Sequence, residues 1–274
     1  MNESSTARGT SPTAATLAEF RIGAKAMLRS QFALILREAR MRHGRSRIGY
    51  AWAVIEPFAI VLLLTLLFSG VFRGGPIHPE IALFYATGVL PFKYFRHASS
   101  FIGLSLEANA PLFSYPTVRE FDAALARLVL DTITSLLITT LVLGVVILIF
   151  GVPGPAHLET MLVAFAGLAL LALGVGLNVA TLQRRFQMTH HVYNMLMTPA
   201  FVLSCVFFSL NSIPAGFREI LAWNPVVHGV EGFRLGYFKD YGDQYISFAY
   251  LYLVGLVALF LGMAQLLLSR RGLI

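Results

Sequence analysis

The stretch TMLVAFAGLALLALGVGLNVATL, residues 160–182, decides the fold class of this chain. It contains no Asp, Glu, Lys or Arg, and it is long enough to cross the hydrocarbon layer of a membrane, which takes about 20 mostly apolar residues as a helix. The whole chain has the same character, because 57% of its 274 residues are hydrophobic and only 13% are charged, whereas soluble domains are about 25% charged. The sequence therefore predicts an all-α polytopic membrane protein.

Further apolar runs of similar length lie on both sides of this stretch, and together they predict six transmembrane helices. The runs cover residues 51–72, 81–106, 128–150, 160–182, 192–211 and 246–268. We expect them to form one transmembrane domain, residues 51–274. The polar, broken stretch 213–244 predicts short re-entrant or interfacial helices before the last span.

The N-terminal 50 residues divide into two parts. Residues 1–16 are small and polar, which is typical of a disordered tail. Residues 17–50 predict an amphipathic interfacial helix followed by a basic juxtamembrane segment, because apolar residues recur there at helical spacing between basic ones. A cytosolic helix packed against a partner explains the same apolar stripe equally well.

The distribution of basic residues predicts the orientation of the chain. Most of the 21 Lys and Arg residues fall in the N-terminal tail and in the loops that share its side of the membrane. Because basic residues near membrane spans are retained in the cytoplasm, we expect both termini to be cytoplasmic. The net charge of +7 is then a topology signal, with attraction to anionic membrane lipid as a second role, and nucleic-acid binding is not expected.

The second apolar run contains an unusual polar face. Lys93, Arg96, His97 and Ser100 are spaced so that a helix places them on one side. A cation at that depth costs at least a few kcal/mol unless it faces protein or water. These four residues should therefore line an interior and form part of a substrate path.

Three explanations of these cations remain open at the level of sequence. They could attract an anionic substrate or a lipid phosphate, pair with Asp131 or Glu107, or reach along the helix to the membrane surface. Tyr94 and Phe95 lie among them, and aromatic rings offer a surface over which a bulky substrate can slide. We therefore add both aromatic residues to the predicted substrate path.

The segment where the chain enters the membrane carries a recognisable order of residues. A basic cluster begins at Arg37, and Gly49, Tyr50, Trp52 and Pro57 follow it. Basic and aromatic side chains suit the headgroup zone, and Pro57 falls in the first turns of the predicted span, where a missing N–H matters least. This order resembles the start of the first span in type-2 ABC transporter permeases that export bacterial polysaccharides.

Two further segments carry the same resemblance. The loop with Asn109, Phe113, Tyr115, Arg119 and Asp122 resembles the capsular polysaccharide branch, the polysaccharide/polyol phosphate exporter family, in which this loop holds the short helix contacted by the ATPase. The stretch from residue 224 to residue 234 resembles the outward-facing segment before the last span of these permeases.

The chain itself has no site for ATP. A phosphate-binding P-loop requires Gly-Lys followed by Ser or Thr, and none of the three lysines, Lys25, Lys93 and Lys239, follows a glycine. We find no catalytic or metal-binding motif either, so the chain is predicted to be no enzyme and to hold no cofactor. ATP and Mg would be bound by a separate ATPase that docks on the inner loop 107–127.

The resemblance implies the permease subunit of an ATP-driven exporter in the bacterial cell inner membrane. Its substrate would be an acidic, lipid-linked capsular polysaccharide. Its partners would be a second copy of the chain, two ATPase subunits, a periplasmic adaptor or co-polymerase, and an outer-membrane export channel. An O-antigen or teichoic acid exporter of the same family is an alternative. Alternatives from other classes are a non-transporting membrane scaffold and an ion-coupled secondary transporter, for which Asp131 would be the proton site.

Overall fold

The computed structural model describes residues 31–40, 47–73, 79–114 and 119–270, and every regular element in these ranges is a helix. Residues 31–40 are helical. The elements that follow are α2 (Arg47–Arg73), α3 (Pro79–Gly103), α4 (Ser105–Ala108), η1 (Ala110–Ser114), α5 (Glu120–Phe150), α6 (Leu158–Arg185), α7 (Thr189–Leu203), η2 (Leu210–Ser212), α8 (Ala215–Ala222), α9 (Pro225–Tyr237) and α10 (Phe248–Arg270). The predicted tail 1–16 and the first part of the predicted interfacial helix lie outside the described residues.

The predicted all-α fold is confirmed, and each predicted apolar run falls largely within one long helix. Four helices, α2, α5, α6 and α10, are long and apolar enough to cross a membrane. The helices of the other two predicted spans do not meet this description. Helix α3 carries Lys93 and Arg96 within its length, and α7 has only 15 residues. Six spans and the orientation of the termini stay predictions.

Several boundaries differ from the predicted ones. Helix α3 ends at Gly103, α5 begins at Glu120 and α7 ends at Leu203. Charged residues in the first turn of α5 hid its true start, because an apolar run marks only the part of a helix that faces lipid or core. The apolar run after Leu203 continues, but the backbone turns at Cys205, whose φ is 57°.

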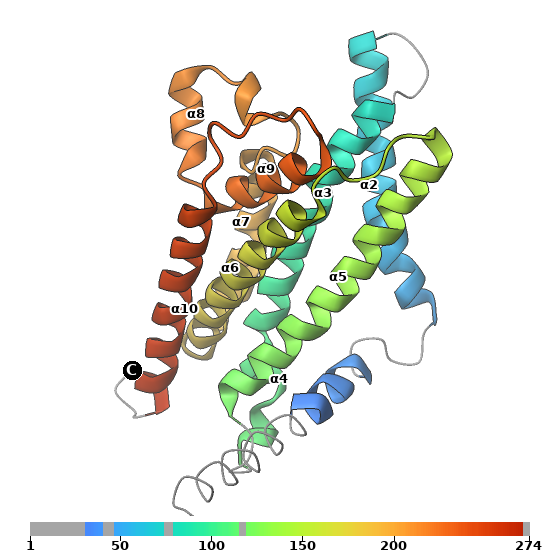
Figure 1. Cartoon of the computed structure of the whole chain (residues 1–274). Coiled ribbons are helices and arrows are strands. Elements are labelled where there is room, and N and C mark those ends of the chain that lie inside the picture. The colour runs from blue at the N-terminus through green and yellow to red at the C-terminus, as the bar shows by residue number, and fades with distance from the viewer. Residues whose placement is uncertain (1–30, 41–46, 74–78, 115–118, 271–274) are drawn as a thin grey trace, which may run out of the picture.

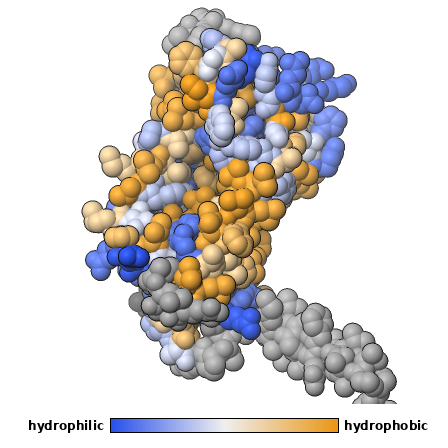
Figure 2. Space-filling model, turned by 90° about the vertical axis from the view of Figure 1, so that its left-hand side faces the viewer, coloured by the Kyte–Doolittle hydropathy of each residue, from blue (hydrophilic) through white to orange (hydrophobic). Residues whose placement is uncertain are grey.

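The long helices form a bundle with distinct ends. Figure 1 shows residues 31–40, α4 and the C-terminal end of α10 at one end, and α8 at the other. We call the first of these the inner end. Apolar side chains cover much of the middle of the face in Figure 2, while hydrophilic ones gather towards the ends. A membrane protein is expected to show this distribution, because the middle of its surface contacts the hydrocarbon of the bilayer and its ends contact water.

Helix α6 is the most enclosed of the four. Of its apolar membrane-spanning stretch, 61% is buried inside the protein, against 22% for α5 and 22% for α10. Its glycines allow neighbouring backbones to approach. A Cβ on Gly174 would lie 2.5 Å from the backbone nitrogen of Leu259 in α10, and one on Gly176 would lie 2.6 Å from Cβ of Ile102 in α3. Small residues at such crossings are a common way for membrane helices to pack closely.

We expect Gly174→Ala to lower the stability of the protein by about 1–3 kcal/mol, because the added methyl group meets the backbone of α10 and forces the helices apart. The apparent melting temperature of the purified protein in detergent measures this loss. Gly144 in α5 is the matched control, since nothing lies within 4 Å of a Cβ added there. A Gly174→Ala protein that melts with the wild type would contradict the close crossing.

Candidate functional site

The polar face of α3 is shared between two sides of the helix. Lys93 and His97 are directed to α2 and α5: Lys93 Nζ donates to Oε1 of Glu56 at 2.5 Å, and Nδ1 of His97 lies 2.7 Å from Oδ1 of Asp131. Ser100 is directed to α7, with its hydroxyl 2.9 Å from Nε2 of His190. The predicted pairing with Asp131 therefore occurs, and His97 is the member of the polar face that makes it.

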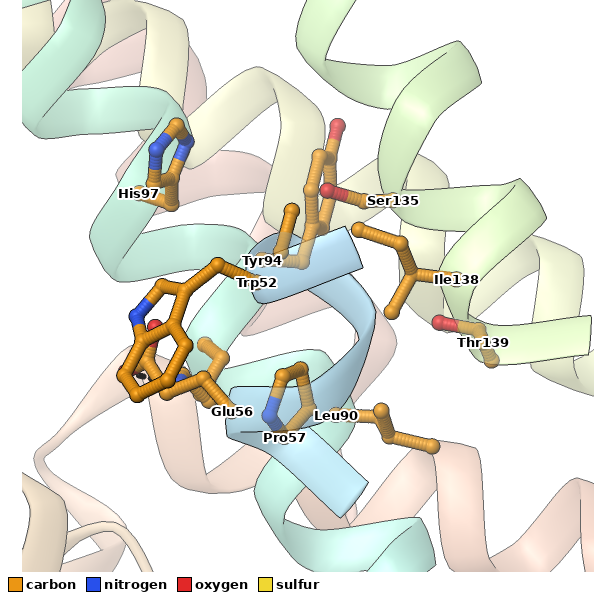
Figure 3. A pocket seen from close by; sticks show the side chains of 11 residues that line it. Trp52, Glu56, Pro57, Leu90, Tyr94, His97, Ser135, Ile138 and Thr139 are labelled. Carbon is orange, nitrogen blue, oxygen red and sulfur yellow. Dashed lines mark hydrogen bonds and ion pairs between the residues drawn. The ribbon is translucent and has the colours of Figure 1, made fainter. Parts of the chain in front are cut away.

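A cavity of about 360 Å³ lies between α2, α3 and α5. Trp52 and Glu56 of α2 line it together with Lys93 and His97 of α3, and α5 adds Ser135, Ile138 and Thr139. In Figure 3, Trp52 and His97 lie on one side of this space and the α5 residues on the other. The Trp52 side chain is 61% exposed. The cavity thus combines a cation, a carboxylate, hydroxyl groups and an accessible aromatic ring.

Pro57 also lines this cavity, and it occupies a different place in its helix from the one predicted. Helix α2 begins at Arg47, so Pro57 lies inside it and not in its first turns. Proline has no N–H to donate to the carbonyl four residues earlier, which belongs to Ala53, another lining residue. Gly49 and Tyr50 fall within α2, but their side chains are outside the described part of the structure.

The two predicted aromatic residues of the path, Tyr94 and Phe95, are buried within the chain. Tyr94 stacks on Phe165 of α6 with 4.0 Å between ring centroids, and its hydroxyl lies 2.7 Å from Oγ1 of Thr132 in α5. Its ring thereby ties α3 to α5 and α6. The predicted contact of these two residues with substrate stays a prediction.

Arg96 differs from the other two basic residues of this face. Among the residues that the structure describes, no carboxylate lies within ion-pair distance of its half-buried guanidinium group. Beside it, Ser99 and Ser100 bond to Tyr193 and Asn194 of α7. The rest of α7 presents large apolar side chains that the chain leaves uncovered, namely Val192, Met195, Leu196, Val202 and Leu203. Among the basic residues of this face, Arg96 is therefore the one best placed to meet a group from outside the chain.

At the inner end, a buried polar cluster fastens residues 31–40 to the rest of the chain. Arg37 Nη1 donates to Oδ1 of Asn109, and Nδ2 of Asn109 donates to Oε1 of Glu38 at 2.8 Å. The other oxygen of Glu38 lies 3.1 Å from Nε of Arg127 in α5. The structure thus joins Arg37 and Asn109, which the sequence had assigned to separate sites.

Glu38 and Arg127 were not among the predicted site residues, although both are central to this cluster. Both side chains are almost completely buried, with exposed fractions of 2% and 5%. Glu38 is a single carboxylate within a run of arginines, and this is the signal that could have marked it.

The remaining residues of the predicted ATPase loop lie on two elements. Phe113 is in η1, where the guanidinium carbon of Arg184 lies 5.8 Å from its ring centroid. Asp122 accepts a hydrogen bond from the backbone N–H of Arg119 at 3.3 Å, so these two residues start α5. The prediction of a loop as far as residue 127 is therefore wrong in its last part, and Tyr115 lies outside the described residues.

A second buried cluster holds the opposite half of the bundle. Arg234 of α9 has no exposed surface. Its guanidinium group donates to the carbonyls of Cys205 at 2.5 Å and Val206 at 2.7 Å and to Oε1 of Glu231 at 2.8 Å. The side chain also lies over the ring of Phe84 in α3, 3.9 Å from its centroid. Arg234 therefore supplies the donors that the backbone needs where α7 ends.

Tyr241 completes this cluster from the loop before α10. Its hydroxyl donates to Oε2 of Glu231 at 2.8 Å. Burial, and secondly the Glu231 carboxylate, raise the pKa of Tyr241, so the hydroxyl remains protonated and stays a donor. The resemblance placed Arg234 at the end of an outward-facing segment, and the structure shows that its side chain is fully buried, because it donates to the freed carbonyls beyond α7.

Most of the chain is similar in sequence to known membrane transport proteins. A sequence model described as ABC-2 type transporter matches residues 30–238. The polysialic acid transport protein KpsM of Escherichia coli is 32% identical over 232 residues, which cover 85% of this chain and 90% of KpsM. The capsule polysaccharide export inner-membrane proteins CtrC of Neisseria meningitidis and BexB of Haemophilus influenzae are 30% and 27% identical, each over 88% of this chain and 91% of the relative. The match over residues 30–238 includes the cavity, the Glu38–Arg127 cluster, and Glu231 with Arg234.

Removing the carboxylate of Glu38 should release residues 31–40 from the inner end. Loss of one partner from a buried ion pair costs about 3–5 kcal/mol, so we expect Glu38→Ala to accelerate hydrogen exchange of this helix at least tenfold. Mass spectrometry of deuterium uptake measures the effect. Arg40→Ala changes an exposed residue of the same helix and should leave exchange unaltered, and equal protection in both variants would refute the fastening role.

Arg234→Met should strongly destabilise the protein, because it leaves Glu231 buried without its cation and the carbonyls beyond α7 without a donor. The expected loss is about 3–5 kcal/mol, seen as a lower melting temperature and less monodisperse protein in detergent. Adding Glu231→Gln to the same chain should recover part of the loss. Wild-type melting of Arg234→Met would show that the cluster does not hold this half of the fold.

Proposed function

Because the chain belongs to the ABC-2 type transporter family, we propose that it is the permease subunit of an ATP-driven exporter of capsular polysaccharide in a bacterial inner membrane. One observation carries this proposal. Three relatives named for polysialic acid transport or capsule polysaccharide export align with 85–88% of the chain. The family match over residues 30–238 covers residues 31–40 and every helix from α2 to α9.

We extend the proposal to the arrangement in the membrane. Six helices, α2, α3, α5, α6, α7 and α10, cross or enter the bilayer, and the inner end faces the cytoplasm with both termini. The common location of residues 31–40 and the end of α10 supports this orientation (Figure 1). The polar residues of α3 are tolerated at depth because most of them have partners in other helices.

The path for the glycan then runs along the side of α3 that carries Arg96. In a single protomer this side lies next to the uncovered apolar face of α7, and a two-fold symmetric partner would cover that face. A homodimer would bring two copies of Arg96 to a shared path. An acidic, lipid-linked polysaccharide would find there an arginine that no carboxylate of the described chain neutralises.

The driving force comes from a partner in this proposal. Two ATPase subunits, which bind the ATP and Mg, dock on the inner end formed by residues 31–40, α4 and η1. The fastening of Glu38 to Arg127 means that force on this surface reaches α5 directly. A periplasmic adaptor or co-polymerase and an outer-membrane channel would receive the polymer on the other side.

The substitution Arg96→Met tests the proposal with two readouts in cells that carry the complete export system. Surface polysaccharide should fall about tenfold, the factor expected when one charge-assisted contact is lost. An ATPase subunit should still co-purify with the variant, because the inner end is untouched.

Lys239→Met is the matched control, since it removes a cation from an exposed loop, and both readouts should stay at the wild-type level. Failure of the wild-type chain to retain any ATPase in mild detergent would overturn the ATP-driven exporter. Full export by Arg96→Met would instead remove Arg96 from the path.

A further inference from the structure

The cavity between α2, α3 and α5 lies in the inner half of the bundle. Trp52 is near the start of α2, at Arg47, and His97 is near the end of α3, at Gly103. At about 1.5 Å per residue, both lie about 8–9 Å from those helix ends. Lys93 lies deeper, about 15 Å from the end of α3. In the orientation proposed above, on which this inference rests, the cavity therefore reaches from the cytoplasmic leaflet towards the middle of the membrane.

The ion pair at the edge of the cavity is partly exposed on both sides. The side chains of Lys93 and Glu56 are 24% and 49% exposed, whereas Asp131, the partner of His97, is fully buried. An ion pair within a membrane protein adds little stability over a well-packed apolar pair. A lysine ammonium is a compact charge with three donors, so Lys93 can exchange Glu56 for an anionic group that enters the cavity.

The other walls favour a molecule that bears hydroxyl groups as well as a charge. Ser135 and Thr139 contribute hydroxyls from α5, and the carbonyl of Ala53 lacks its α-helical donor because of Pro57. Trp52 adds an exposed ring whose face can pack on C–H groups. Leu90 and Ile138 are apolar, which suits the glycerol or acyl part of an amphipathic ligand.

The size of the cavity restricts what it can hold. Its volume of about 360 Å³ lies near the lower limit for small-ligand pockets, roughly 300–1,000 Å³. It can accept a headgroup but not a folded length of polymer. It is also lined by α2, α3 and α5 of a single chain, so it is distinct from the path along α7.

We propose that this cavity binds the phosphate-bearing, hydroxylated headgroup of an anionic lipid of the cytoplasmic leaflet. The phosphate displaces Glu56 from Lys93, and the headgroup hydroxyls bond to Ser135, Thr139 or the Ala53 carbonyl. Two sources offer this chemistry: phosphatidylglycerol of the membrane itself and the lipid carrier of the exported glycan.

Fluorescence of Trp52 tests the proposal directly. The chain contains two tryptophans, Trp52 and Trp223, so Trp223→Phe leaves a single reporter at the cavity. The full chain is reconstituted in phosphatidylcholine vesicles that contain either brominated phosphatidylglycerol or brominated phosphatidylcholine. The ratio of the two quenching titrations gives the preference of the site for the anionic lipid.

In the Trp223→Phe background we expect a preference for phosphatidylglycerol of roughly tenfold, as for one charge-assisted contact. Lys93→Met should abolish it. Glu56→Gln should increase it severalfold, because Lys93 then has no competing carboxylate. Arg96→Met, which removes a cation of the same helix that does not line the cavity, should leave the preference unchanged.

Equal quenching by the two lipids, or a preference that survives Lys93→Met, would overturn the site. Glu56→Gln guards against misfolding of the lysine variant, since a gain in preference requires folded protein, and no gain would also overturn the proposal. None of these results bears on the co-purified ATPase, so the exporter assignment is tested independently.

A competition experiment identifies the source of the headgroup. Unbrominated lipid extract from cells that make the polysaccharide is compared with extract from cells without its glycosyltransferases. Stronger relief of quenching by the first extract assigns the site to the glycan carrier. Equal relief by both assigns it to phosphatidylglycerol.

Discussion

The fold depends on one buried guanidinium group, that of Arg234. Backbone carbonyls that leave a helix inside apolar surroundings cost several kcal/mol each unless they find donors. Arg234 supplies donors to Cys205 and Val206, and Glu231 balances its charge. Gly88 of α3 leaves the space that the side chain occupies. Because of this arrangement α7 can stop early, and the chain can turn back so that α9 packs between the long helices.

Ion pairs between side chains of different elements recur in the described part of the chain. Lys93 and Glu56 join α3 to α2, His97 and Asp131 join α3 to α5, and Glu38 and Arg127 join the N-terminal helix to α5. These pairs define how the helices are rotated about their axes, because each requires two side chains to meet. Arg96 stands apart from this scheme.

The apolar runs predicted which segments are helices, because a helix that crosses a membrane needs a run of apolar residues of matching length. The spacing of Lys93, Arg96, His97 and Ser100 likewise predicted a polar face on α3. Their division between two sides could not be predicted, since it depends on where α2, α5 and α7 pack. The first turn of α5 and the burial of Arg234 were missed for a related reason: hydropathy registers contact with lipid and not contact between polar groups inside the protein. The family resemblance, which was read from short motifs, was confirmed over most of the chain.

The uneven burial of the long helices has a mechanical consequence. Helix α6 touches the α10 backbone at Gly174 and crosses α3 at Gly176, whereas α2 and α5 bury only 28% and 22% of their apolar membrane-spanning stretches. Backbone contacts of this kind resist shear, because no side chain can rearrange to absorb a displacement. The molecule thus has one pair of helices, α6 and α10, in close backbone contact. We expect a displacement at the inner end to move α2 and α5 more than this pair, because the backbone contact leaves α6 and α10 little room to slide.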